Sequence, residues 1–180
     1  MKSLAVLLIS AFCACALPAA ADTNDQAPKP GLEWQKLAYY IGTWRAEGVM
    51  RPTKSFPGGK FDNVTSNEWV EDGFFYLTRH QEHNPTGTHT MVGITGYDPV
   101  KKVYFRYFFG EDGGVSQETG GLQGDTWTWN GEFQTSKGES IKTRSVDTPV
   151  SPTSFKFIWQ IQRAGGDWVT LQEGTATKVE

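Results

Sequence analysis

Four side chains that could do chemistry alternate along one segment of the chain. Tyr76, Thr78, His80 and Glu82 are each two positions apart. Side chains of a β-strand alternate between its two faces, so in an extended segment these four share one face. If that face looks into a closed interior, a neutral His80 beside Glu82 could act as a general base or orient a polar group of a ligand.

The opposite orientation of this segment stays open. Arg79 and Gln81 would then be the inward pair, and His80 and Glu82 would meet water. The alternation pattern does not decide between the two orientations, because residues 74–77 are apolar on both faces. We therefore assign no catalytic residue and keep His80 and Glu82 as candidates only.

Three histidines, His80, His83 and His89, lie close enough in sequence to suggest a metal site. Residues three apart on a strand point to opposite faces, so His80 and His83 could share an ion only across a bulge. Otherwise His83 would have to pair with His89 across a turn at 84–87. The chain has no cysteine after residue 21 and no His-x-x-x-His pair on a helix. We predict no metal site.

Aromatic residues at alternate positions form the second candidate set. The groups that share a face are Phe105, Tyr107 and Phe109; Trp127 and Trp129; and Phe155, Phe157, Trp159 and Ile161. Aromatic side chains bury large areas, and Tyr and Trp also carry a hydrogen-bonding group. Such a lining suits a ligand with a ring or acyl chain and one polar end.

The ligand-binding residues predicted from these patterns are Tyr76, His80, Phe105, Tyr107, Trp127, Trp129, Phe157 and Trp159. An equal alternative is a solid core, in which the same aromatics simply fill the interior. Tyr104 and Arg106 fall on the opposite face from Phe105, so we expect them outside.

The elements that must position these residues are short strands separated by turn-forming residues. We predict strands at 43–50, 61–71, 74–83, 88–97, 102–109, 114–121, 125–134, 139–147, 154–163 and 167–178. This spacing, with no helical segment between strands, predicts an all-β fold: a single antiparallel up-and-down β-barrel of about ten strands. A two-sheet sandwich is the alternative.

The segment before the first strand predicts a short helix. Leu32, Trp34, Leu37 and Ile41 recur at spacings of two to four and end at Gly42. We expect this helix to close one end of the barrel. The predicted organisation is therefore a signal peptide at 1–21, a flexible lead-in at 22–31 and a barrel domain at 32–180.

Residues 1–21 have the layout of a cleaved secretory signal: Lys2, an apolar stretch and a run of alanines. The apolar stretch is shorter than the roughly 20 residues of a membrane span. The predicted location is thus the periplasm or the extracellular space. The net charge of the whole chain is −3 and no basic stretch is present, which disfavours nucleic acid as a partner.

Two motifs resemble a known family. Gly42-Thr43-Trp44 is similar to the opening strand of the calycin superfamily, which includes lipocalins, fatty-acid-binding proteins and nitrobindin-like haem barrels. Together with Gly96-Tyr97-Asp98 and the strands that follow, it resembles the family catalogued as domain of unknown function fifteen seventy-nine, over about residues 32–178. The resemblance implies a calycin-like barrel in which Trp44 plugs one end, with a cation over its ring. Arg144, Arg163 and Lys178 are the candidates for that cation.

Departures from related barrels limit what the resemblance implies. No Thr-Asp-Tyr follows Asp98, so lipocalin-type carriage is not implied, and Asp98 itself is interpreted as a turn former. Nitrobindin-like proteins bind haem through a late histidine, whereas the last histidine here is His89. We therefore expect no haem and no other cofactor.

Three functions remain. The favoured one is an exported barrel that holds a small apolar or amphipathic molecule in an aromatic-lined interior. The second is an enzyme, an isomerase or hydrolase, that uses His80 and Glu82 for acid–base chemistry. The third is a structural or interaction protein with a solid core. The sequence leaves the oligomeric state open.

Overall fold

The computed structural model describes residues 29–53, 56–162 and 165–179. The predicted signal peptide at 1–21 and the first part of the lead-in, up to residue 28, lie outside these residues, as does Arg163.

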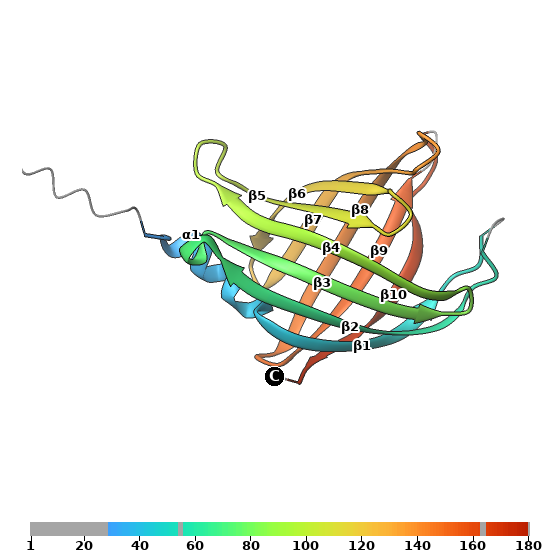
Figure 1. The fold of residues 1–180 in the computed structure, drawn as a ribbon, viewed down its shortest axis with the longest axis horizontal. Coiled ribbons are helices and arrows are strands. Elements are labelled where there is room, and N and C mark those ends of the chain that lie inside the picture. Colours follow the sequence, from blue (N-terminus) through green and yellow to red (C-terminus); the bar gives the residue numbers. More distant parts are fainter. Residues whose placement is uncertain (1–28, 54–55, 163–164, 180) are drawn as a thin grey trace, which may run out of the picture.

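Ten antiparallel strands form a closed barrel (Figure 1). Each strand pairs with the next one in sequence, and β10 pairs with β1. The strands are β1 (Gly42–Met50), β2 (Gly59–Val70), β3 (Phe75–Asn84), β4 (Gly87–Asp98), β5 (Val103–Gly110), β6 (Val115–Gln123), β7 (Thr126–Gln134), β8 (Ser140–Ser151), β9 (Ser154–Gln162) and β10 (Val169–Lys178). The predicted up-and-down barrel is confirmed, and the sandwich alternative is wrong.

A short helical segment lies at one end of the barrel, as predicted (Figure 1). It consists of α1 (Leu32–Lys36) and the 3-10 helix η1 (Leu37–Tyr40). Leu37 and Tyr40 are buried. The backbone oxygen of Tyr40 accepts hydrogen bonds from the Trp44 indole and the Asn67 amide, both at 2.8 Å. These bonds fix the segment to β1 and β2, and we call this the closed end.

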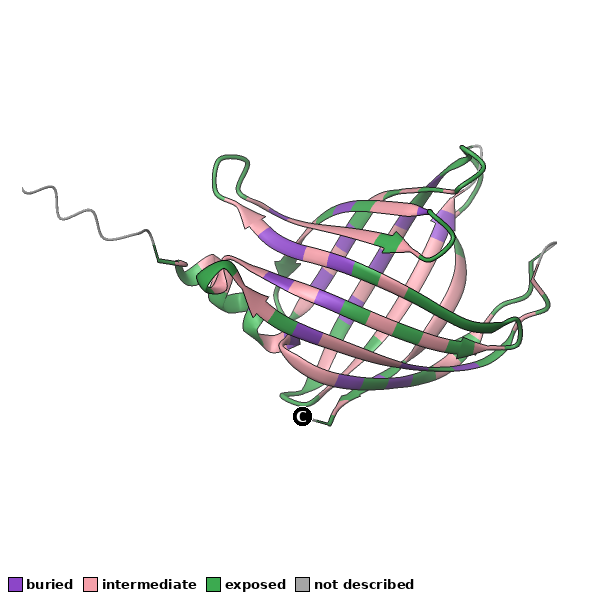
Figure 2. Cartoon of the chain, in the orientation of Figure 1, coloured by how far each residue is buried: buried purple, intermediate pink, exposed green. Residues whose placement is uncertain are grey.

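The opposite end of the barrel carries the turns at 85–86, 111–114 and 135–139, and we call it the open end. A 3-10 turn, η2 (Glu71–Gly73), joins β2 to β3 at the closed end. Along most strands buried and more exposed residues alternate (Figure 2), as expected for a wall with one face inward.

Aromatic rings fill the barrel near the closed end. Trp127 and Trp129 are 2% and 0% exposed, and their rings stack at 5.6 Å. Tyr104 packs edge-on against Trp127 at 4.8 Å, and Tyr40 contacts the same ring at 5.8 Å. The interior here is solid.

Trp44, predicted to plug the barrel, lies beside this core and is 3% exposed. Its ring contacts Tyr39 at 5.5 Å and Phe155 at 5.0 Å. Of the cations considered for its face, the structure places Lys178 there, with Nζ 5.8 Å from the ring centre. Arg144 instead lies over Trp168, at 4.5 Å.

The predicted facing of β5 is wrong. Tyr104, Arg106 and Phe108 point inward, and Phe105 and Tyr107 lie on the outer face, where their rings contact each other at 6.0 Å. The alternation of aromatic residues gave the wrong inward face because both faces of this strand carry aromatic residues. A buried Arg106 is tolerated because the interior supplies its partners, described below.

Candidate functional site: a cavity with one apolar and one polar wall

A cavity of about 650 Å³ occupies the barrel between the aromatic core and the open end. It begins at Tyr40 and Trp44 and reaches Glu111 and Asp112 in the turn between β5 and β6. Its volume lies within the roughly 300–1,000 Å³ that small-molecule sites usually have. The alternative of an interior filled throughout is therefore wrong for this half of the barrel.

One wall of the cavity is apolar and comes from three neighbouring strands, β1, β9 and β10. Its residues are Trp44, Ala46, Met50, Phe155, Phe157, Trp159 and Ala176. Small residues in this wall leave room for the rings. Gly174 pairs with Phe157 on one side and Gly48 on the other, and a Cβ atom on it would lie 2.9 Å from the Phe157 ring.

The facing wall carries most of the polar groups, together with Met91, Phe108 and Phe133, and Arg106 on β5 is at its centre. Its Nε donates to Glu118 Oε2 on β6 at 2.5 Å, and its Nη2 donates to Ser145 Oγ on β8 at 2.7 Å. The guanidinium group also lies 4.4 Å from the centre of the Trp129 ring. Arg106 is thus held by an ion pair, a hydrogen bond and a cation–π contact at once.

The carboxylates around Arg106 are buried as well. Glu118 is 3% exposed and accepts a second hydrogen bond from Thr143 Oγ1 at 2.9 Å. Asp147 on β8 accepts a hydrogen bond from the Tyr40 hydroxyl at 2.9 Å. The side chains that hold these charges thus come from η1 and from the four strands β5, β6, β7 and β8. The contribution of β7 is Trp129.

Burial and charge set the protonation of this group. Burial lowers the pKa of Arg106, but the adjacent Glu118 and Asp147 raise it by more, so the guanidinium stays charged. Burial raises the pKa of Asp147, and the nearby Arg106 partly offsets that rise.

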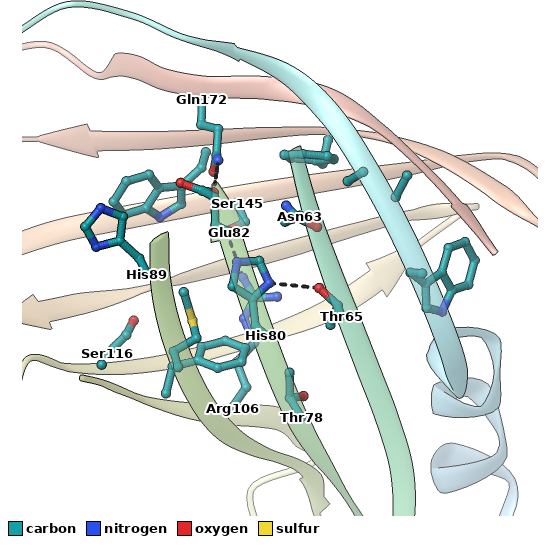
Figure 3. Close-up of a pocket in the computed structure, with 18 of the residues that line it drawn as sticks. Asn63, Thr65, Thr78, His80, Glu82, His89, Arg106, Ser116, Ser145 and Gln172 are labelled. Atoms are coloured by element: carbon teal, nitrogen blue, oxygen red, sulfur yellow. Dashed lines mark hydrogen bonds between the residues drawn. The ribbon is translucent and has the colours of Figure 1, made fainter. Parts of the chain in front are cut away.

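His80 lines the cavity from β3, next to the polar wall. Its Nδ1 lies 2.8 Å from Thr65 Oγ1 on β2, and Figure 3 shows this pair with Asn63 beside it. Burial lowers the pKa of His80, with Glu82 acting in the opposite direction, so the imidazole is neutral at pH 7. Its second ring nitrogen can donate to or accept from a ligand, depending on the tautomer.

His80 and Glu82 share a face but have different partners. Glu82 Oε2 accepts a hydrogen bond from Gln172 Nε2 at 2.6 Å (Figure 3), and Oε1 accepts one from Asn84 Nδ2 at 2.9 Å. His80 is bonded to Thr65. The inward orientation of this face is the one found, and the alternative with Arg79 and Gln81 inward is wrong, because both are exposed.

The predicted ligand-binding residues divide into three groups. Tyr76, His80, Phe157 and Trp159 line the cavity. Trp127 and Trp129 face inward but belong to the solid core at the closed end. Phe105 and Tyr107 lie outside the barrel. Of the other histidines, His83 is exposed and bonded to Thr88, and His89 lies at the cavity rim, 3.2 Å from Glu111.

Sequence reasoning missed the charged centre of the polar wall, Arg106, Glu118 and Asp147. One signal was available: Thr143, Ser145 and Asp147 alternate along one segment, as do Ser116 and Glu118. Such alternation of polar residues usually marks a solvated face. In this barrel it marks a polar interior.

The fold is a closed antiparallel barrel of ten strands with a cavity in one half and a short helical segment at the other end. The chain belongs to the family "Protein of unknown function (DUF1579)", whose model matches residues 29–178. It is also similar in structure to Rv2717c from M. tuberculosis, with a TM-score of 0.64 and 11% sequence identity, over 83% of this chain and 99% of that one. At this identity the likeness shows the fold alone.

The comparison with curated proteins gave no match. Within the part of the chain that the structure describes, no helix has the length and apolar composition needed to cross a membrane.

Proposed function

We propose that this protein is an exported carrier that binds a small amphipathic molecule inside its barrel. The observation that carries the proposal is the division of a 650 Å³ cavity into an apolar wall and a polar wall. A ligand with a hydrocarbon part and one polar end could satisfy both walls, whereas a wholly apolar one would leave polar groups such as Asn63 facing it.

The ligand would lie with its apolar part against Phe155, Phe157 and Trp159. Burying a hydrocarbon chain there contributes about 0.8 kcal/mol per methylene group. Its polar end would reach His80, whose free ring nitrogen offers one hydrogen bond. Because Arg106 and Glu118 are already locked together, this wall is organised before the ligand arrives, which reduces the entropy lost on binding.

A cavity-filling substitution tests the proposal. Ala46→Phe places a ring in the cavity from β1, and we expect it to abolish binding of decanol, followed by tryptophan fluorescence or calorimetry. Val49→Phe is the matched control, because Val49 is on the same strand but 44% exposed. Saturable binding to the unmodified protein and to Val49→Phe, but not to Ala46→Phe, supports the proposal. No saturable binding, or equal binding by all three proteins, contradicts it.

The natural ligand can be sought in parallel. Native mass spectrometry of the protein purified from its own source would detect a retained small molecule. The same spectrum gives the mass of the mature chain, and removal of residues 1–21 is the result that export requires.

One observation supports the enzyme alternative: His80 is neutral, lines the cavity and could accept a proton. Its hydrogen-bond partner is a threonine and not a carboxylate. The Glu82 carboxylate, whose charge would favour the imidazolium, is instead bonded to Gln172 and Asn84. A turnover that His80→Ala abolishes while ligand affinity is kept would favour the enzyme over the carrier.

A further inference from the structure

The charge of the cavity lining restricts what can bind. Five carboxylates line it: Glu82, Glu111, Asp112, Glu118 and Asp147. Among the described lining residues, Arg106 is the single lysine or arginine. With the two histidines neutral the formal charge is 1 − 5 = −4, or −3 when Asp147 is protonated.

Arg106 is a poor anchor for an anion because its charge is already compensated, although it keeps N–H groups beyond the two that donate to the protein. Its Nε and Nη2 already donate to Glu118 and Ser145. A ligand carboxylate that took the place of Glu118 would leave that buried side chain charged and without its partner, which is strongly unfavourable. Asp147 adds a second negative charge near the same guanidinium.

The remaining carboxylates lie toward the open end. Glu82 accepts hydrogen bonds from two neutral amides, which orient it and leave its charge in place. Glu111 accepts bonds from the Thr90 hydroxyl and backbone N–H, both at 3.0 Å. His89 is the one basic partner in this group, and it carries charge only when protonated. A cavity lined by an excess of one sign of charge concentrates ligands of the opposite sign.

Aromatic rings accompany these carboxylates. A Cβ atom built on Gly114 would lie 2.7 Å from the Phe133 ring and 3.1 Å from the Asp112 carboxylate, so ring and carboxylate flank the same glycine. Trp159 is opposite Gln172, the residue that holds Glu82. A carboxylate together with the face of an aromatic ring is an environment that favours an organic cation.

From this arrangement we infer that the cavity selects amphiphiles with a cationic, amine-type head and rejects anionic ones such as fatty acids. The inference rests on the proposed carrier function and adds the ligand class to it. The cavity provides the binding site, and the excess of carboxylates over cationic side chains gives it a preference for a cationic head. The amine lies toward the open end near Glu82 and Asp112, and the alkyl chain lies along the apolar wall.

Three probes with one alkyl chain and different heads test this: decylammonium, decanol and decanoate, each titrated below its micelle concentration at low salt and neutral pH. We expect affinity to fall in that order, with at least about tenfold between the amine and the acid, equivalent to about 1.4 kcal/mol. The gap should narrow as salt is added.

Variants that remove one carboxylate charge show which residues cause the preference for decylammonium. Glu82→Gln and Asp112→Asn should each weaken decylammonium binding about three- to tenfold and change decanol binding by clearly less. Asp62→Asn is the control, since Asp62 is on the exposed face of β2 and its substitution changes the net charge equally. Circular dichroism of each variant confirms that it folds.

The outcomes separate the two proposals. If none of the three probes binds, the carrier function fails, and the ligand class with it. If decanol binds but decanoate binds as well as or better than decylammonium, the carrier stands and the inference about the cationic head is overturned. An equal effect of Asp62→Asn and Glu82→Gln on decylammonium binding would also overturn it, because it would show a general charge effect.

Discussion

The two halves of the barrel interior are built from the same alternating strands yet end up different. Near the closed end several inward positions carry large rings, and Trp127, Trp129 and Tyr104 fill much of the space. From mid-strand toward the open end the inward positions of β1 and β10 include the small Ala46, Ala176 and Gly174 beside Met50 and Gln172, and a cavity remains. In this barrel, side-chain volume decides between core and cavity, since all ten strands close around both halves.

This contrast separates stability from function. The solid half has no space for a ligand and provides packing. The hollow half has fewer neighbours for each ring and a buried ion pair, so it contributes less packing energy and provides binding groups. Substitutions should therefore have different consequences in the two halves.

The largest expected effect is on the solid half. Trp129→Ala removes a fully buried ring stacked on Trp127 and should lower the free energy of unfolding by about 3–5 kcal/mol. Phe157→Ala, in the cavity wall, should cost clearly less, because one side of that ring already faces empty space. Urea unfolding of both variants measures the difference, and equal losses would contradict the contrast between the halves.

A similar or slightly smaller effect is expected from breaking the buried ion pair. Glu118→Gln leaves Arg106 charged and without its partner, which should cost about 3 kcal/mol. The double substitution Arg106→Met with Glu118→Leu should recover part of that loss, because no buried charge is left uncompensated. If the double variant is less stable than Glu118→Gln, the pair contributes little and other contacts of Arg106 dominate.

The smallest effect concerns pH. The pKa of His80 is lowered below 6.5 by burial, so at acidic pH the unfolded chain binds a proton that the folded chain does not. Stability should therefore be complete above pH 6.5 and fall as the pH drops below it, by at most about 1.4 kcal/mol per pH unit. His80→Gln should remove this component, as judged from unfolding free energies between pH 5 and 8, whereas substituting the exposed His83 should not.

The fold was largely predictable from sequence because turn residues and alternation are local signals. Asp98, for instance, accepts backbone N–H bonds from Val100 and Lys101 in the turn where it was expected. The inward face of β5 was not predictable, since Tyr104 and Phe105 are equally suited to burial. The burial of Arg106 decides which face of β5 is inward, because its partner Glu118 is in the interior. Glu118 lies on another strand, β6, so local periodicity does not reveal the pair.

The candidate site was predictable in its apolar half and not in its polar half. Phe157 and Trp159 follow the aromatic alternation of β9 and line the cavity. Asp147 is buried because the Tyr40 hydroxyl meets it from a segment 107 residues earlier. A buried polar residue is recognisable only with its partner, and such distant pairs leave no mark on local periodicity.

The most direct test of the two-walled cavity is a crystal structure with ω-bromodecanol, using the anomalous signal of bromine to locate the chain end. We predict one bromine position inside the barrel, against the apolar wall near Phe157, with the hydroxyl group toward His80. A bromine bound instead on the outer face beside Phe105 and Tyr107, with the interior unoccupied, would contradict the account.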